Sequence, residues 1–315
     1  DKLLKHASSL VRKGCHVAAI KSGGSEAGSR AASSHTGALA SSDLAVDALF
    51  RKAGIVRCYG REELSTVASI FMHPEIKGKQ IAIITHAGGP AVMLTDALSQ
   101  GGLNIPAIEG HEADELLTHL YPGSSVSNPI DILATGTAEQ VGIVIDYCDK
   151  KFDNIDAMMV IFGSTGLNEV FDVYEVIHQK MKTCTKPIFP ILPSVSTARK
   201  EVEDFLSKGH INFPDEVVLG NAIAKVLNTP KPAEEKIFLD GVDIPEIRRI
   251  IDLAESGYIS ENEIQGLLDA AKIPRVPGAV VKTRKLLIAR AEEMGYPVVL
   301  KVVGPVHKSD VGGVT

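Results

Sequence analysis

Short runs of consecutive apolar residues alternate along the chain with stretches whose apolar residues recur every three or four positions. The runs predict buried strands, and the recurring positions predict amphipathic helices. The expected strands are 16–21, 54–59, 80–85, 157–162 and 188–192, and the expected helices are 43–53, 61–72, 90–99, 139–150, 197–208 and 215 to 227. Almost wholly apolar strands that alternate with helices are typical of a parallel sheet covered on both faces. The pattern therefore predicts an α/β protein.

Breaks in the pattern divide the chain into four segments. Residues 1–74 supply only two strands, fewer than a doubly wound sheet has, so either the first domain is a remnant or the chain is a fragment. Residues 75–228 form a more complete α/β domain, and residues 229–256, which open with Pro and charged side chains, are expected to be a linker. Residues 257–315 open a further domain, with a capping box at its start and expected strands at 279–282 and 297–303 around a helix at 283–294.

Composition and charge narrow the class of protein. The 315 residues exceed the size of most single cores, and 44% of them are hydrophobic and 23% charged, as in an ordinary globular protein. The net charge of −6 favours neither nucleic acid nor anionic lipid as a partner. We expect no membrane span, no signal peptide and a cytoplasmic location. The four cysteines contain no C-x-x-C pair, so we expect free buried thiols and no metal site.

A loop rich in small residues follows the first expected strand and contains Ser33-Ser34-His35-Thr36-Gly37. Loops at the carboxyl ends of parallel strands line the ligand crevice in such folds, so an exposed histidine there is a candidate phosphate acceptor. A surface histidine in a flexible loop explains the same residues. The nearby Glu26 and Arg30 are read as solvated charges without a role.

A second candidate is the turn His86-Ala87-Gly88-Gly89-Pro90-Ala91 between an expected strand and helix. The unpaired N–H groups at Gly88, Gly89 and Ala91 would suit an oxyanion or phosphoryl group without a basic side chain. A tight turn without a ligand is the alternative. The pattern is not the G-x-G-x-x-G of a dinucleotide site.

Two further motifs complete the set. Asn128-Pro129-Ile130-Asp131 is read as an Asx turn before a strand, a structural feature. Lys301 ends an apolar strand, where an anion such as a nucleotide phosphate would compensate its charge, although a strand end that reaches solvent explains it equally well.

Taken in order, these motifs resemble the NDP-forming acyl-CoA synthetases, the ADP-forming acetate–CoA ligase group that is related to succinyl-CoA synthetase. The resemblance rests on the segments 34–40, 85–90, 128–131 and 295–314 and covers practically the whole chain. It implies flavodoxin-like domains followed by the start of an ATP-grasp domain. Residues 1–74 would be the carboxyl-terminal part of the first flavodoxin-like domain, and residues 75–228 the second, CoA-ligase domain.

The same resemblance implies roles for single residues. His35 would be the phosphohistidine, with Ser34, Thr36 and Gly37 beside it and Gly88, Gly89 and Ala91 binding phosphate. Lys301 would contact nucleotide phosphates, and His307 would be a second histidine that carries phosphate toward the nucleotide. ATP or ADP, CoA and Mg²⁺ would be bound, with the Mg²⁺ ligands outside this chain.

The implied activity interconverts acyl-CoA, ADP and phosphate with carboxylic acid, CoA and ATP through an acyl phosphate and a phosphohistidine. The partners would be a small carboxylic acid or its acyl-CoA, a nucleotide, and either other subunits or missing segments of the same polypeptide. We expect that the isolated chain cannot complete a turnover. A non-catalytic ligand-sensing module, such as the ligase-like part of a protein acetyltransferase, is the alternative, and an FMN-binding flavodoxin is less favoured because aromatic residues are few.

Overall fold

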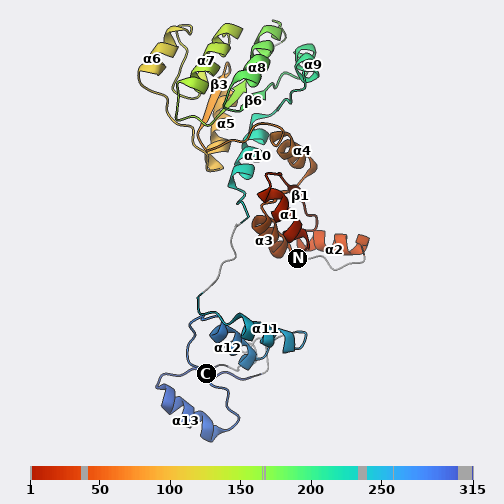
Figure 1. Ribbon diagram of the computed structural model, residues 1–315, viewed down its shortest axis with the longest axis vertical. Coiled ribbons are helices and arrows are strands. Elements are labelled where there is room, and N and C mark those ends of the chain that lie inside the picture. Colours follow the sequence, from red (N-terminus) through yellow and green to blue (C-terminus); the bar gives the residue numbers. More distant parts are fainter. Residues whose placement is uncertain are drawn as a thin grey trace. The chain divides into compact units, whose positions relative to one another are not determined.

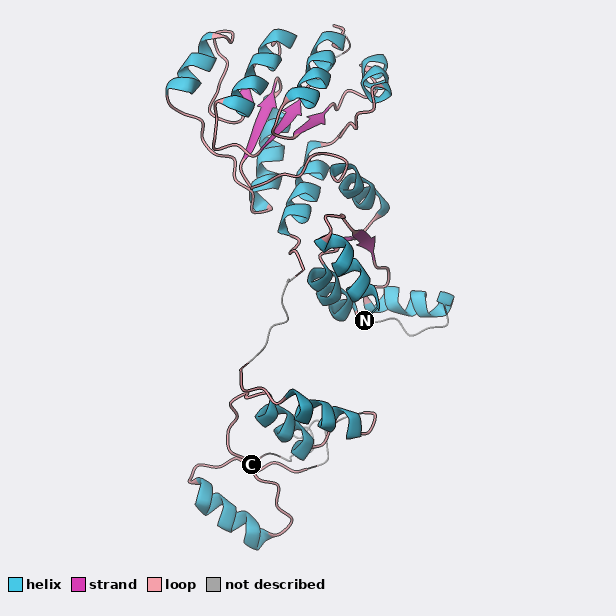
Figure 2. Cartoon of the chain, viewed as in Figure 1, coloured by secondary structure: helices cyan, strands magenta, loops and turns pink. Residues whose placement is uncertain are grey.

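The computed structural model describes residues 2–36, 42–164, 166, 168–232, 240–257, 259–303 and 314 (Figure 1). The chain divides into two compact units, Asp1–Glu234 and Glu235–Thr315. Strands and helices alternate in the first unit, and the described part of the second unit is helical (Figure 2). Within the described ranges, no helix combines the length and the apolar character needed to cross a bilayer.

A small parallel sheet forms the amino-terminal part of the first unit. Its elements are α1 (Lys2–Arg12), β1 (Ala18–Ile20), α2 (Glu26–Thr36), α3 (Asp43–Ala53), β2 (Val56–Cys58) and α4 (Arg61–Ile70). Helix α3 ends at Gly54, whose φ of 74° is left-handed and favours glycine, as the predicted stop signal requires. Helices α1 and α3 pack together around a small core that includes Phe50 and Ile55.

A four-stranded parallel sheet forms the rest of the unit, with the strand order β4-β3-β5-β6. Its elements are β3 (Ile81–Thr85), α5 (Gly88–Gln100), α6 (His111–Thr118), β4 (Ile130–Asp131), α7 (Ala138–Lys150), β5 (Ala157–Ile161), α8 (Phe171–Thr183), β6 (Ile188–Ile191), α9 (Arg199–Ser207) and α10 (Glu216–Asn228). The sequence predicted β3, β5 and β6 to within one residue at each end.

Helices cover both faces of this sheet, which explains why its strands are apolar throughout. Ile81 and Ile83 of β3 pack with α5, α10 and α4 on one face, and Ala82 and Ile84 pack with α6, α7, α8 and α9 on the other. All five residues of β3 and of β5 are buried. The α/β prediction is confirmed, and this sheet holds the main core of the protein.

The second unit consists of α11 (Ile244–Leu253), α12 (Glu261–Ala270) and α13 (Arg284–Met294). The capping box predicted at Ser260 and Glu263 starts α12. Helix α11 lies inside the segment predicted as a linker, but it packs on α12, where Gly266 leaves room for Ile250. Residues 244–253 are therefore part of this unit rather than a free connection.

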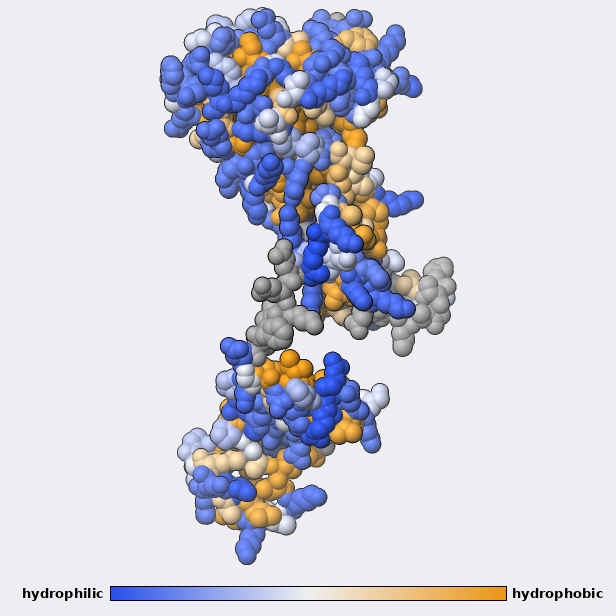
Figure 3. Space-filling view, in the orientation of Figure 1, coloured by the Kyte–Doolittle hydropathy of each residue, from blue (hydrophilic) through white to orange (hydrophobic). Residues whose placement is uncertain are grey.

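The two strands expected in this unit are wrong for the described residues. Segments 279–282 and 297–303 have no regular secondary structure, and a single antiparallel bridge joins Lys301 to Val314. A strand needs a neighbour to pair its backbone groups, and no described segment supplies one. Figure 3 shows apolar surface on this unit. Its exposed apolar side chains include Val276 (86% exposed) and Val299 (66% exposed).

Four helices of the first unit were not predicted: α1, α2, α6 and α8. Helix α2 bears on function, because Ser33 and His35 were expected in a loop. That prediction is wrong: the chain is helical from Glu26 to Thr36. Glycine and serine suggested a loop, but three alanines and the ion pair between Glu26 and Arg30, spaced four residues apart at 2.8 Å, stabilise a helix.

Candidate functional site

The carboxyl edge of the four-stranded sheet contains the point at which its strand order reverses. From β3 the chain passes to β4 on one side and then returns to β5 on the other side. In open α/β sheets, ligands bind outside the carboxyl ends of the strands at such a point. The residues that follow β3, β4 and β5 there are His86, Ile132 and Phe162.

Helix α5 presents its amino end at this edge. Thr85 closes the turn, because its hydroxyl accepts the N–H of Ala87 at 2.9 Å and donates to the Ala87 carbonyl at 2.8 Å. No side chain caps the helix, and Gly88 and Gly89 are exposed. Their N–H groups and the helix dipole are therefore available to an anion. Ala91, in the same first turn, is buried.

His86 joins the ends of β3 and β5 at this edge. Its Nε2 lies 2.9 Å from the carbonyl oxygen of Gly163 and 3.1 Å from the Gly163 nitrogen, and its ring lies 4.3 Å from that of Phe162. Burial lowers the pKa of His86, an effect partly opposed by the charge of Asp131, so the ring is neutral at pH 7. Its Nδ1 is buried and has no hydrogen-bond partner among the described residues.

Asp131 approaches the α5 terminus from β4. One carboxylate oxygen accepts the N–H of Leu133 at 2.8 Å, and the other lies 4.0 Å from the position that a Cβ on Gly88 would occupy. The sequence motif had suggested only an Asx turn here. Asp131 ends β4, and β4 pairs with β3, which leads to Gly88. This position could have indicated that Asp131 lies at the same edge as Gly88.

Asn128 has a structural role, as predicted, but through contacts with β3 and Pro106 rather than through the expected Asx turn. Its side-chain amide donates to the carbonyls of Ile81 and Pro106 at 2.9 and 3.0 Å, and its oxygen accepts the N–H of Ile83 at 2.9 Å. Asn128 has a φ of 63°, which asparagine tolerates better than most residues. It fixes the start of β4 against β3.

The loops after β5 and β6 complete the edge. Ser194 accepts the N–H of Ser164 at 2.8 Å, and a Cβ on Gly163 would stand 2.6 Å from the Ser194 hydroxyl oxygen. Glycine at position 163, where His86 also binds, therefore leaves room for the Ser194 hydroxyl. Neither Gly163 nor Ser194 was a candidate from the sequence, because only the sheet brings them to His86.

The structure does not bring the predicted His35 segment to this edge. Ser34 is exposed in α2, which Figure 1 draws beside α1 and α3 and away from β3. None of residues 26–34 is buried. The side chains of His35 and Thr36, and the whole of Gly37, lie outside the description. Lys301 is exposed in the second unit, and His307 falls on residues that are not described.

Metal and nucleotide binding were the other expectations from the resemblance, with the Mg²⁺ ligands expected outside this chain. The described residues contain no cluster of three or more His, Cys, Asp or Glu side chains that would hold a metal ion. Lys301 is the residue predicted to contact a nucleotide, and its side chain is exposed.

Comparisons with known proteins assign the two ends of the chain. Residues 1–71 match the succinyl-CoA ligase like flavodoxin domain, and residues 253–315 match an ATP-grasp domain. ADP-forming acetate–CoA ligase I of Archaeoglobus fulgidus is 32% identical over 321 residues, covering 99% of this chain and 46% of that protein. The α subunit of ADP-forming acetate–CoA ligase II of Pyrococcus furiosus is 40% identical over 129 residues, 41% of this chain and 28% of that subunit.

A solved structure supports the fold. The dinucleotide-forming acetyl-coenzyme A synthetase 1 of Ca. Korarchaeum cryptofilum, in complex with phosphate and ADP, matches with a TM-score of 0.65 at 24% identity, over 71% of this chain and 49% of that chain. Almost the whole of this chain aligns with curated relatives such as the Archaeoglobus fulgidus ligase, but it spans only about half of their length. It is thus a relative of the ADP-forming acetate–CoA ligases, with a flavodoxin-like segment at its amino end and the start of an ATP-grasp domain at its carboxyl end.

Proposed function

We propose that this chain is part of an ADP-forming acyl-CoA ligase, which interconverts acyl-CoA, ADP and phosphate with carboxylic acid, CoA and ATP. The observation that carries the proposal is the 32% identity to an acetate–CoA ligase along 99% of the chain. The exposed, uncapped start of α5 at the point where the strand order reverses supports it, because phosphoryl transfer needs an anion site.

In the proposed reaction, phosphate attacks the acyl carbon of acyl-CoA and releases CoA. A ring nitrogen of His35 then attacks the phosphorus of the acyl phosphate, so that a P–N bond forms, the P–O bond to the acyl group breaks and the carboxylate leaves. The phosphoryl group passes, through His307, to the terminal phosphate of ADP. A neutral imidazole is nucleophilic near pH 7 and is a reactive phosphoryl donor once phosphorylated.

We assign phosphoryl binding to the backbone N–H groups of Gly88, Gly89 and Ala91, which lie in the first turn of α5. Movement of α2 would bring His35, Ser34, Thr36 and Gly37 to this terminus. The absence of buried side chains over residues 26–34 supports this movement, because little apolar surface holds that part of the helix in place.

At the other end of the chain, Lys301 and His307 would face the nucleotide within the ATP-grasp domain. We further propose that the chain works together with other segments or subunits. The Pyrococcus furiosus relative, which is named as a subunit, supports a homo- or hetero-oligomer.

Phosphate labelling tests the proposal. The protein is incubated with ³²P-labelled acetyl phosphate, digested at alkaline pH and mapped for acid-labile phosphate. We expect label on His35, and we expect its loss in His35→Asn. His6→Asn, which replaces an exposed histidine of α1, is the matched control and should label normally.

Two results separate the proposal from the ligand-sensing alternative. A sensor would bind acyl-CoA or phosphate without forming a P–N bond, so binding without any label would reject the ligase mechanism. Label on another histidine that persists in His35→Asn would reject the assignment to His35.

A further inference from the structure

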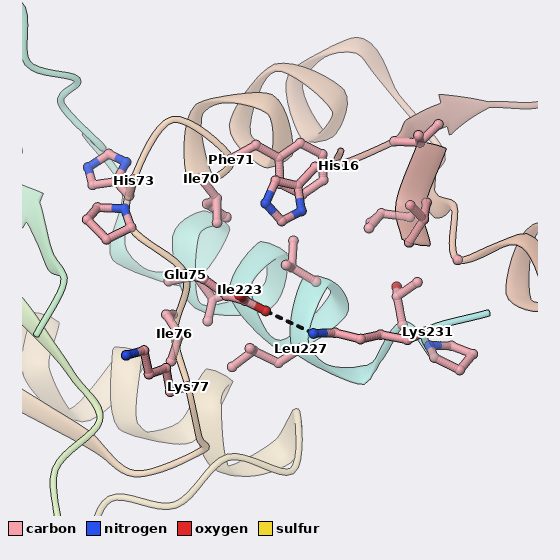
Figure 4. A pocket seen from close by; sticks show the side chains of 18 of the residues that line it. His16, Ile70, Phe71, His73, Glu75, Ile76, Lys77, Ile223, Leu227 and Lys231 are labelled. Carbon is pink, nitrogen blue, oxygen red and sulfur yellow. Dashed lines mark hydrogen bonds and ion pairs between the residues drawn. The ribbon is translucent and has the colours of Figure 1, made fainter. Parts of the chain in front are cut away.

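A cavity of 530 Å³ lies within the first unit, between the small sheet and the amino ends of the large one. Figure 4 shows walls from four places: the segment before β1, the end of α4, the segment that leads into β3, and α10. Its volume is in the range of about 300–1,000 Å³ that small-molecule sites occupy. The cavity lies at the opposite end of β3 from Gly88, so it is separate from the proposed phosphoryl site.

The walls of the cavity are mostly apolar. Ile70 of α4 and Ile223 of α10 are buried along it, and Phe189 of β6 is fully buried behind it. His16 and Phe71 stack on one another, with ring centroids 4.7 Å apart and an angle of 17° between the rings. Stacking fixes the two rings against each other and adds aromatic surface to the wall, which suits an apolar body better than a chain of polar groups.

The rim of the cavity is cationic, although the whole chain carries a net charge of −6. Lys77, Lys79 and Lys231 line it, and Glu75 is its one acidic side chain. Lys79 donates to the side-chain oxygen of Asn228 at 2.8 Å. The rim therefore favours a ligand with negative charge.

Glu75 and Lys231, which both line the cavity, form an ion pair with a distance of 3.1 Å between Nζ and Oε1, drawn as a dashed line in Figure 4. Their side chains are 60% and 84% exposed. An ion pair so exposed contributes little to stability, because water competes for both groups. A ligand carboxylate can therefore take the place of Glu75 on Lys231 at small cost.

We infer that this cavity binds a small amphipathic anion with an apolar body and one carboxylate or sulfonate. The body lies against the wall formed by Phe71 and His16, and the acidic group pairs with Lys231. This inference does not rest on the proposed ligase activity, since it uses none of the residues assigned to that reaction.

Cys15 offers a reporter, since it is exposed and lines the cavity. Cys58 and Cys148 are buried, and burial raises the pKa of Cys184 to about 11 and that of Cys148 to about 12. Ellman's reagent should therefore react first at Cys15. The chain contains no Trp, so protein emission does not mask a fluorescent probe.

The test uses 8-anilinonaphthalene-1-sulfonate and its uncharged counterpart N-phenyl-1-naphthylamine. We expect the sulfonate to bind saturably and to slow the reaction of Cys15. Lys231→Glu should weaken binding of the sulfonate by about tenfold and leave the uncharged probe within about twofold. Lys5→Glu, the same charge change on exposed α1, is the control and should alter neither affinity by more than about twofold.

Three results would overturn the inference. The first is no saturable binding of the sulfonate. The second is binding that leaves the Cys15 reaction rate unchanged, which would place the probe elsewhere. The third is a Lys231→Glu variant that affects both probes equally, which would show that Lys231 does not recognise the charge.

Discussion

The imidazole Nε2 of His86 lies 3.1 Å from the backbone nitrogen of Gly163 and 2.9 Å from its carbonyl oxygen. One side chain from the end of β3 thus holds the backbone at the end of β5, at the point where the strand order reverses. This contact fixes the edge from which α5 begins.

Replacing His86 should separate these two strand ends. We expect His86→Ala to lower the free energy of unfolding by about 1–3 kcal/mol, because it leaves the Gly163 backbone without its partner. His86→Gln should retain most of the stability, since its amide reaches as far as Nε2 and can both donate and accept. Urea denaturation measures both. His111→Ala, at an exposed position, is the control, and equal losses for Ala and Gln would contradict this account.

Gly163 is constrained by Ser194 as well as by His86. A Cβ at position 163 would stand 2.6 Å from the Ser194 hydroxyl oxygen, so Gly163→Ala should destabilise the protein by about 1–3 kcal/mol. Ser194→Ala removes that oxygen, and the double variant should be more stable than the two single losses predict. Thermal unfolding of the four proteins forms the cycle. Gly89→Ala, with nothing within 4 Å of the added Cβ, is the control.

If the losses of stability in the two single variants simply add in the double variant, the proposed clash between a methyl group at position 163 and the Ser194 hydroxyl is contradicted. Such additivity would mean that the loop after β6 moves aside when Gly163 gains a side chain, and that Ser194 does not set the position of the β5 loop.

The strands that place this edge were predictable because burial on both faces leaves a clear signature. Segments 80–85 and 157–162 are nearly all apolar, and the structure makes β3 and β5 from them. Gly88 and Gly89 were likewise predictable, because a strand, two glycines and a proline define a local turn.

The remaining contacts depend on residues far apart in sequence. Gly163 lies 77 positions from His86, and nothing in either segment indicates the other. Helix α2 was missed for another reason. None of residues 26–34 is buried, so the helix has no need of apolar residues at every third or fourth position, and that repeat is what predicts a helix from sequence. The two strands expected in the second unit fail because strand formation depends on a paired neighbour rather than on apolar sequence alone.

Asn128 should be the least replaceable polar residue at the start of β4. Asn128→Ala removes three hydrogen bonds to β3 and its flanking loop and leaves three backbone groups unpaired, so we expect a loss of about 2–4 kcal/mol. Asn128→Asp keeps one acceptor but sets a carboxylate against two carbonyls, and should be no more stable than the alanine variant. Asn154→Ala, at an exposed position, is the control for urea denaturation. A stable Asn128→Asp protein would contradict the assigned contacts.

Stability should fall with acidity because of His73. Burial lowers its pKa below the ordinary 6.5, although its contact with the Ser69 carbonyl opposes the shift. As the pH falls through 6.5, the unfolded chain takes up a proton that the folded chain does not, so stability is lost between that pH and the lower pKa of the folded state. His73→Leu keeps an apolar contact with Phe189 and should flatten the slope by up to about 1.4 kcal/mol per pH unit. Urea denaturation at a series of pH values above and below 6.5 measures it. The exposed His6→Leu should leave the slope unchanged, and an unchanged slope in His73→Leu would show that another group titrates.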